Sequence, residues 1–294
     1  MPAGNVASGK LPNSWNRTLN RMLKQRIITA IILAVIVVGT ILGLDSLYVS
    51  MLLALTLLVS VMELTNMTLS RETKIQWAGG LLLAALFMLL LPHNGIRSVF
   101  YQSYLGLLMW VAISLFMLRY RYSGQWSLAT KRFVFLFSLL LFWICINGLY
   151  FMHSHFAQGG WLMMYLLTLV WVADIGAYFS GRKFGRHKLA PGISPGKTWE
   201  GVAGGLALNA IWISLVFLLS DGWGISYLPF LVLGLITSAI SVVGDLYESI
   251  LKREAGLKDS GKLLPGHGGV LDRIDSIIAA TPVFISGLYM LTAV

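Results

Sequence analysis

Long apolar runs dominate the chain and restrict the structures that it can form. A helix that crosses a bilayer needs about 20 apolar residues at roughly 1.5 Å each. Nine runs in the 294-residue chain approach or exceed that length: 27–44, 46–69, 75–91, 98–118, 133–152, 161–181, 201–220, 227–244 and 276–294. Because a spanning segment must satisfy its own backbone hydrogen bonds, the runs predict an all-α polytopic integral membrane protein with about nine transmembrane helices.

The composition supports this class, since 57% of the residues are hydrophobic and only 12% are charged. The first apolar run lies behind 26 residues and is followed by no small-residue cleavage site, so we expect it to stay in the mature chain. Residues 1–26 are therefore predicted to be a cytoplasmic tail. Residues 27–294 are predicted to form a single membrane domain, with helices 1–5 within 27–152 and helices 6–9, carrying the active site, within 161–294.

The basic residues predict the orientation. With nine helices, 21 of the 22 Lys and Arg residues fall on one side, and only Arg97 falls in an opposite loop. Since basic loops stay in the cytoplasm during insertion, we expect the N-terminus to be cytoplasmic and the C-terminus outside. The net charge of +10 then reflects topology and contact with anionic membrane lipids, and we expect no nucleic-acid partner.

Two acidic residues lie inside apolar runs far from the other charges. Asp174 lies seven residues, about 10 Å, before Gly181 at the end of its run, and Tyr178 shares its face at i+4. A carboxylate at such depth costs roughly 2.5 to 3.5 kcal/mol, which favours a functional role over a structural hydrogen bond. Glu63, with Asn66 at i+3, either helps line a lipid entrance or bonds a neighbouring helix.

The loop at residues 181–201 contains Gly196, Lys197 and Thr198, the end of a Walker-type phosphate loop. The first glycine of that motif would fall on Pro191, so the motif is absent. Exposed glycine amides, Ser194, Lys197 and the start of the next helix still suit a phosphate group. A solvated basic loop is the alternative.

The segment 249–275 places ten ionisable residues between two membrane-grade runs. The helix before it carries polar residues three or four positions apart, which form one stripe that we expect to line a cavity. They are Ser238, Ser241, Asp245, Ser249 and Lys252.

Asp272 and Asp275 follow as i,i+3 neighbours, and with Asp245 they supply three carboxylates. Hard cations such as Mg²⁺ bind a few carboxylates together with substrate phosphates, so the pattern indicates phosphoryl or nucleotidyl transfer. In the alternative, Asp272 is an N-cap and Asp275 interacts with the helix dipole.

These residues resemble the signature of the phosphatidate cytidylyltransferases, the CDP-diacylglycerol synthases. The matching positions are Ser249, Lys252-Arg253, Lys258-Asp259, His267-Gly268-Gly269 and Asp272-Arg273-Ile274-Asp275. Asp174, Tyr178, Gly181 and the SPGKTWEG run at 194–201 are also similar to the family. The resemblance is specific over 174–275, while the first 160 residues match only as a series of membrane helices.

The resemblance implies that CTP and phosphatidic acid give CDP-diacylglycerol and pyrophosphate. It implies a bacterial cytoplasmic membrane protein with its active site facing the cytoplasm, a requirement for Mg²⁺, and a homodimer. A second cation, monovalent or divalent, is a further expectation.

The resemblance also implies roles for individual residues. Asp245, Asp272 and Asp275 are expected to hold the metal, and Lys252 to act with them in catalysis. The remaining residues are expected to bind substrate: Asp174, Tyr178, Ser194, Lys197, Ser249, Arg253, Lys258, His267, Gly268, Gly269 and Arg273.

Two other functions fit part of the pattern. A secondary transporter also places carboxylates within the membrane, although it usually shows repeated halves that this sequence lacks. A CTP-dependent lipid or polyprenol kinase would transfer the γ-phosphate to a hydroxyl and release CDP instead of pyrophosphate.

Overall fold

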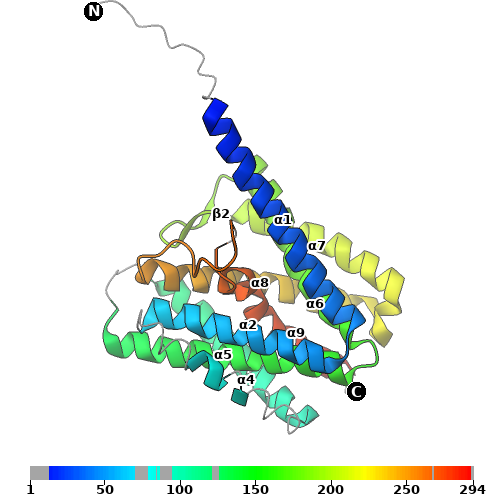
Figure 1. Ribbon diagram of the computed structural model, residues 1–294. Coiled ribbons are helices and arrows are strands. Elements are labelled where there is room, and N and C mark those ends of the chain that lie inside the picture. The colour runs from blue at the N-terminus through cyan, green and yellow to red at the C-terminus, as the bar shows by residue number, and fades with distance from the viewer. Residues whose placement is uncertain are drawn as a thin grey trace, which may run out of the picture.

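The computed structural model describes residues 13–69, 79–83, 85–86, 95–120, 126–266 and 268–292. For residues 13–26 and for Asp221 it describes the backbone alone. Its helices and strands are α1 (Asn13–Gly43), α2 (Ser46–Thr68), α4 (Ile96–Arg119), α5 (Leu128–His155), α6 (Gly159–Phe184), β1 (Lys188–Ala190), β2 (Ser194–Thr198), α7 (Trp199–Ser220), the 3₁₀ turn η2 (Asp221–Gly224), α8 (Tyr227–Glu254) and α9 (Leu271–Thr292) (Figure 1).

The protein is an all-α polytopic membrane protein, as the apolar runs predict. In the described part of the chain, seven helices are long and apolar enough to cross a membrane, namely α2 and α4 to α9. The apolar part of α1, Ile27–Gly43, is shorter than the others. Most of the predicted span at 75–91 lies outside the described residues, although 79–83 and 85–86 are helical. The total of nine helices and the orientation stay predictions.

Two helix boundaries differ from the predicted spans in ways that matter. α1 begins at Asn13, so residues 13–26 of the predicted tail are helical. That segment contains no Gly or Pro that would stop a helix. α8 continues past residue 244 to Glu254. This extension beyond the apolar run places the whole polar stripe, up to Lys252, on the helix, as the spacing of its residues predicted.

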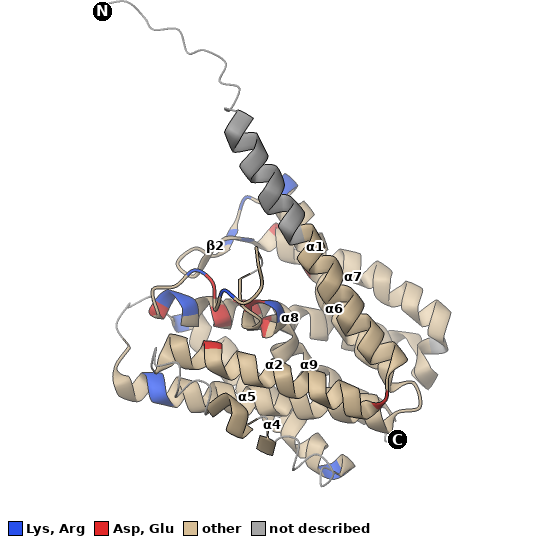
Figure 2. Cartoon of the chain, in the orientation of Figure 1, with Lys and Arg blue, Asp and Glu red and all other residues tan. Residues whose placement is uncertain are grey.

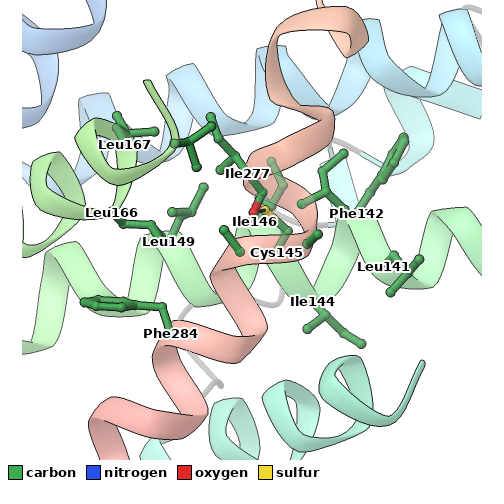
Figure 3. Packing of buried hydrophobic residues seen from close by; sticks show 14 of the residues in the cluster. Leu141, Phe142, Ile144, Cys145, Ile146, Leu149, Leu166, Leu167, Ile277 and Phe284 are labelled. Atoms are coloured by element: carbon green, nitrogen blue, oxygen red, sulfur yellow. Dashed lines mark hydrogen bonds between the residues drawn. The ribbon is translucent and has the colours of Figure 1, made fainter. Parts of the chain in front are cut away.

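α9 is the central helix of the bundle. It packs against α2, α4, α5, α6 and α8, and most of its residues are buried. In Figure 3, Ile277 and Phe284 of α9 lie among side chains of α5 and α6, including Cys145 and Leu166. Contacts on all sides fix the position of the α9 start, where Asp272 and Asp275 lie.

Small residues bring neighbouring helices close to α9. A Cβ atom at Gly106 of α4 would lie 2.7 Å from Pro282 Cβ, and one at Gly148 of α5 would lie 2.4 Å from Ile285 Cδ1. A Cβ at Gly244 of α8 would lie 2.4 Å from the carbonyl oxygen of Asp275. Close approach of this kind is how helices associate where lipid provides no hydrophobic driving force.

A short antiparallel hairpin, β1 and β2, interrupts the helical fold between α6 and α7. The sequence predicted only a loop here. Glu200 at the start of α7 holds His187, which lies just before β1, through a 2.6 Å contact between Oε1 and Nδ1. Figure 2 shows charged segments gathered near β2, the last turns of α8 and the loop that follows it, while most of the length of α5, α6 and α7 carries no charge.

Candidate active site

A cavity of about 330 Å³ opens between α6, β2, α7 and α8. Its charged and tyrosine side chains are those of Asp174, Tyr178, Lys197 and Asp245, all of which the sequence predicted as site residues. Small and apolar residues form most of the remaining wall, including Ala173, Ala177, Gly196, Thr198, Gly201, Val202, Gly205, Leu206, Ser238 and Val242. The cavity is therefore an apolar cleft with a few converging polar groups, which is typical of a ligand site.

Lys197 and Asp245 form an ion pair inside this cavity. Lys197 Nζ lies 2.5 Å from Asp245 Oδ2, and the two side chains keep 24% and 32% of their surface exposed. Asp174 interacts electrostatically with both residues and with Arg273. Because the pair is still accessible, an incoming phosphate could bind Lys197 in place of the carboxylate.

A second charged cluster lies where the end of α8 meets the start of α9. Lys252 Nζ lies 2.5 Å from Glu248 Oε2 and 2.6 Å from Asp272 Oδ1. The exposed fractions of the Lys252, Glu248 and Asp272 side chains are 14%, 3% and 7%. This cluster is shielded, in contrast to the open pair formed by Lys197 and Asp245.

Asp272 has protein donors on both carboxylate oxygens. Oδ1 accepts from Lys252, and Oδ2 accepts from the backbone N–H groups of Ser260 at 2.9 Å and Gly269 at 2.8 Å. The Ser260 hydroxyl lies a further 3.0 Å from Oδ2. Asp272 thus holds the loop between α8 and α9 against the start of α9. This role is structural, like the N-cap role that the sequence offered as the alternative for this residue.

Asp275 and Ser249 lie between the two charged groups. Asp275 is 9% exposed; its Oδ1 accepts from the N–H of Ser276 at 2.6 Å, and it interacts electrostatically with Asp245 and Glu248. The Ser249 hydroxyl donates towards Asp245 Oδ1 at 3.4 Å. The cavity and the shielded cluster are therefore neighbouring parts of one charged region.

The three carboxylates predicted to hold Mg²⁺ do not converge as a complete site. Among the residues that the structure describes, no group of three His, Cys, Asp or Glu side chains is placed to hold a metal ion. Both oxygens of Asp272 already accept hydrogen bonds from protein donors. Asp245 and Asp275 retain suitable oxygen chemistry, and Mg²⁺ often binds only one or two carboxylates together with substrate phosphates.

The other predicted site residues have different surroundings. Arg253 is exposed, and its Nε donates to the Ile193 carbonyl at 3.3 Å, which ties α8 to the hairpin. Ser194 begins β2 but does not line the cavity. Lys258 and Arg273 are exposed. His267 lies outside the described residues.

The two glycines after His267 are needed for different reasons. Gly268 has φ +84°, a conformation that residues with a side chain rarely adopt. A Cβ at Gly269 would lie 2.0 Å from Ser260 Oγ and 2.4 Å from Glu63 Oε2. The sequence predicted that both glycines bind substrate. In the structure, Ser260 and Glu63 occupy the space beside Gly269.

Sequence reasoning missed Glu248 and Ser260, and it named Thr198 only within the loop motifs, without a role. Glu248 is four residues before Lys252, a helical spacing that could have identified the pair. Thr198 accepts from the N–H of Gly201 at 3.1 Å at the start of α7, a contact of the N-cap type. Ser260 had no local signal, because its partners Glu63 and Asp272 are brought to it by folding.

Comparison with known proteins agrees with the resemblance in the sequence. A model of the cytidylyltransferase family matches residues 24–291. The phosphatidate cytidylyltransferase of Haemophilus influenzae is 54% identical over 134 residues, which cover 43% of this chain and 45% of that protein.

Two other relatives of the same name align over more of the chain. The protein of Pseudomonas aeruginosa is 44% identical over 187 residues, covering 63% of this chain and 68% of the relative. That of Staphylococcus haemolyticus is 35% identical over 228 residues, covering 76% of this chain and 84% of the relative.

Proposed function

Because the chain belongs to the cytidylyltransferase family, we propose that it is an enzyme that transfers the cytidylyl group of CTP to phosphatidic acid. The products are CDP-diacylglycerol and pyrophosphate. The names of the relatives support this choice of substrates.

The observation that carries the proposal is the cavity between α6, β2, α7 and α8, with Lys197 and Asp245 paired inside it. Its charged groups lie beside small and apolar wall residues such as Ala173 and Val242. A phosphorylated lipid needs both surroundings at one place, since its head is charged and its chains are apolar.

In the proposed reaction, a phosphate oxygen of phosphatidic acid attacks the α-phosphorus of CTP. A new P–O bond forms, the bond from the α-phosphorus to the oxygen bridging to the β-phosphate breaks, and pyrophosphate leaves with that electron pair. The lipid phosphate is already an anionic nucleophile, so the chain needs no strong general base. Catalysis consists of positioning the two phosphates and balancing the charge that develops.

Residues in different parts of the site have different roles in this reaction. Lys197 binds a substrate phosphate in the cavity and exchanges its Asp245 partner for that phosphate. Lys252 neutralises charge on the leaving pyrophosphate, while Glu248 and Asp272 hold its ammonium group in place. Arg273, which interacts with Asp174, and Lys258 supply further positive charge.

Mg²⁺ remains part of the proposal, held by Asp245 and Asp275 with phosphate oxygens completing the ligand set. When bound, it would balance the charge of the triphosphate and of the departing pyrophosphate. Asp272 is the weakest of the three predicted ligands, because its oxygens already accept from Lys252, Ser260 and Gly269. Asp174 is the place for a second cation.

We further propose a multi-pass arrangement in a bacterial cytoplasmic membrane with the site facing the cytoplasm, where CTP is available. The distribution of Lys and Arg supports this orientation. A homodimer is also proposed, on the family resemblance alone.

The test uses purified protein in mixed micelles with phosphatidic acid, Mg²⁺ and CTP labelled at the α-phosphate. We expect label in the organic phase and one pyrophosphate released per lipid labelled, and we expect EDTA to stop both. CDP as the released product would instead identify a kinase. Well-folded protein that transfers no label would remove the enzyme assignment and favour a transporter.

A further inference from the structure

Glu63 is a buried carboxylate in α2, a helix otherwise composed of apolar and small polar residues. It is 7% exposed. No Lys or Arg shares its helix, and its hydrogen-bond partners in the described part of the chain are hydroxyl and backbone donors. A carboxylate in such a place is costly unless those donors satisfy it.

All of these partners come from a segment about 200 residues later in the chain. Oε2 accepts from the Ser260 hydroxyl at 2.8 Å and from the N–H of Leu271 at 2.9 Å. Oε1 accepts from the N–H of Val270 at 3.1 Å. The two amides belong to the start of α9, where backbone donors lack partners within the helix and a negative charge is favourable.

The loop between α8 and α9 is shaped around this carboxylate. A Cβ atom at Gly261 would lie 2.2 Å from Glu63 Oε1, and its next nearest neighbours are also atoms of Glu63. A Cβ at Gly269 would lie 2.4 Å from Oε2. Side chains at these positions would push Glu63 off its three donors, so glycine is required on both sides of it.

One hydroxyl connects Glu63 to the charged cluster at the site. Ser260 Oγ lies 2.8 Å from Glu63 Oε2 and 3.0 Å from Asp272 Oδ2. The N–H of Ser260 donates to the same Asp272 oxygen. Asp272 in turn contacts Lys252 through its other oxygen.

From this chain of contacts we propose that Glu63 is a positioning residue for the transfer reaction. It fixes the described parts of the loop, 255–266 and 268–270, against the start of α9, and thereby positions Asp272 and the ammonium group of Lys252. The inference rests on the proposed function for the reaction that it serves. It gives α2, in the half of the chain without signature residues, a direct part in the geometry of the site.

The test compares Glu63→Gln, Gly261→Ala and the double variant, each as full-length protein in mixed micelles. Glutamine keeps the shape but replaces one acceptor with a donor, and Gly261→Ala displaces the carboxylate without altering it. Each single variant should lower kcat about 10- to 100-fold, the range for outer-shell partners of site carboxylates. KM for CTP should change by less than about threefold, because the cavity that holds Lys197 is untouched.

Since both changes act through one carboxylate, the double variant should be no more than about threefold worse than the worse single variant. Amide hydrogen exchange at Ser260, Gly269 and Leu271 should be at least about tenfold faster in each variant. Ser60→Ala is the matched control, because Ser60 is a buried polar residue of α2 whose hydroxyl, among the described residues, bonds only to the Thr56 carbonyl of its own helix. It should leave both readouts unchanged.

Effects that multiply in the double variant, or an unchanged exchange rate in Glu63→Gln, would overturn the proposal. So would an equal loss of kcat in Ser60→Ala, which would point to general packing of α2. If the wild type is active and Glu63→Gln is fully active although its loop exchanges faster, the positioning role of Glu63 is refuted and the proposed function stands. An inactive wild type would overturn the proposed function itself.

Discussion

Replacing Lys252 with methionine separates the structural and catalytic consequences of the shielded cluster. The ammonium group lies 2.5 Å from Glu248 and 2.6 Å from Asp272. Asp272 keeps donors from Ser260 and Gly269 when Lys252 is removed. Glu248 would keep no basic partner among the described residues, because its remaining neighbour is the carboxyl group of Asp275.

The cost of Lys252→Met should therefore arise mainly at Glu248. Removing one partner of a buried pair and leaving the other charge uncompensated typically costs about 3 to 5 kcal/mol. The double variant Lys252→Met with Glu248→Gln removes that charge, so we expect it to recover more than half of the lost free energy of unfolding. Turnover should stay about 100-fold below wild type in both variants, since neither has the cation that meets the leaving pyrophosphate.

Two assays measure these quantities on the same preparations. Unfolding in a denaturing detergent titration gives the change in free energy, and transfer of label from CTP to lipid gives kcat per folded molecule. Recovery of turnover together with stability would refute the catalytic role of Lys252. A double variant as unstable as Lys252→Met would refute the argument that Glu248 carries the cost.

Three further variants test other parts of the site. Asp245→Asn and Asp275→Asn should each abolish turnover while membrane insertion persists, as followed by labelled transfer and by recovery from membranes; near-full activity in either would exclude that residue as a metal ligand. Val242→Trp should partly fill the cavity of about 330 Å³ and raise KM for a substrate at least about tenfold, and an unchanged KM would place the substrates elsewhere. Arg253→Gln should remove the hydrogen bond to the Ile193 carbonyl and raise KM for CTP about three- to tenfold, since one exposed charge-assisted hydrogen bond is lost. An unchanged titration of rate against CTP would show that CTP binding does not depend on this hydrogen bond.

Much of the fold followed from residue patterns that need no tertiary information. Runs of about 20 apolar residues predicted the helices α2 and α4 to α9, because a spanning segment has one way to satisfy its backbone. The family resemblance, read from residues between Asp174 and Asp275, is confirmed by the match over 24–291. The start of α1 was missed because its first turns are polar and resemble a tail in composition alone.

The candidate site could be predicted in part. Asp174, Tyr178, Lys197 and Asp245 were identified from sequence, and all four line one cavity. Asp174 was identified because a charge within an apolar run is costly, and Tyr178 because it shares that face. Lys197 was identified from its glycine-rich loop, and Asp245 from the polar stripe of its helix. Which partner each one has could not be predicted in the same way, and the ligand set of Mg²⁺ stays a prediction.

The sequence by itself determined the class of the protein, the extent of most helices and the types of side chain that meet at their ends. Those properties depend on hydrophobicity and helical spacing, which are local along the chain. Only the tertiary structure decided that protein donors occupy both oxygens of Asp272 and that Glu63 caps α9 from a distant helix. Contacts across some 200 residues leave no periodic trace, because burial and geometry, rather than spacing, bring such groups together.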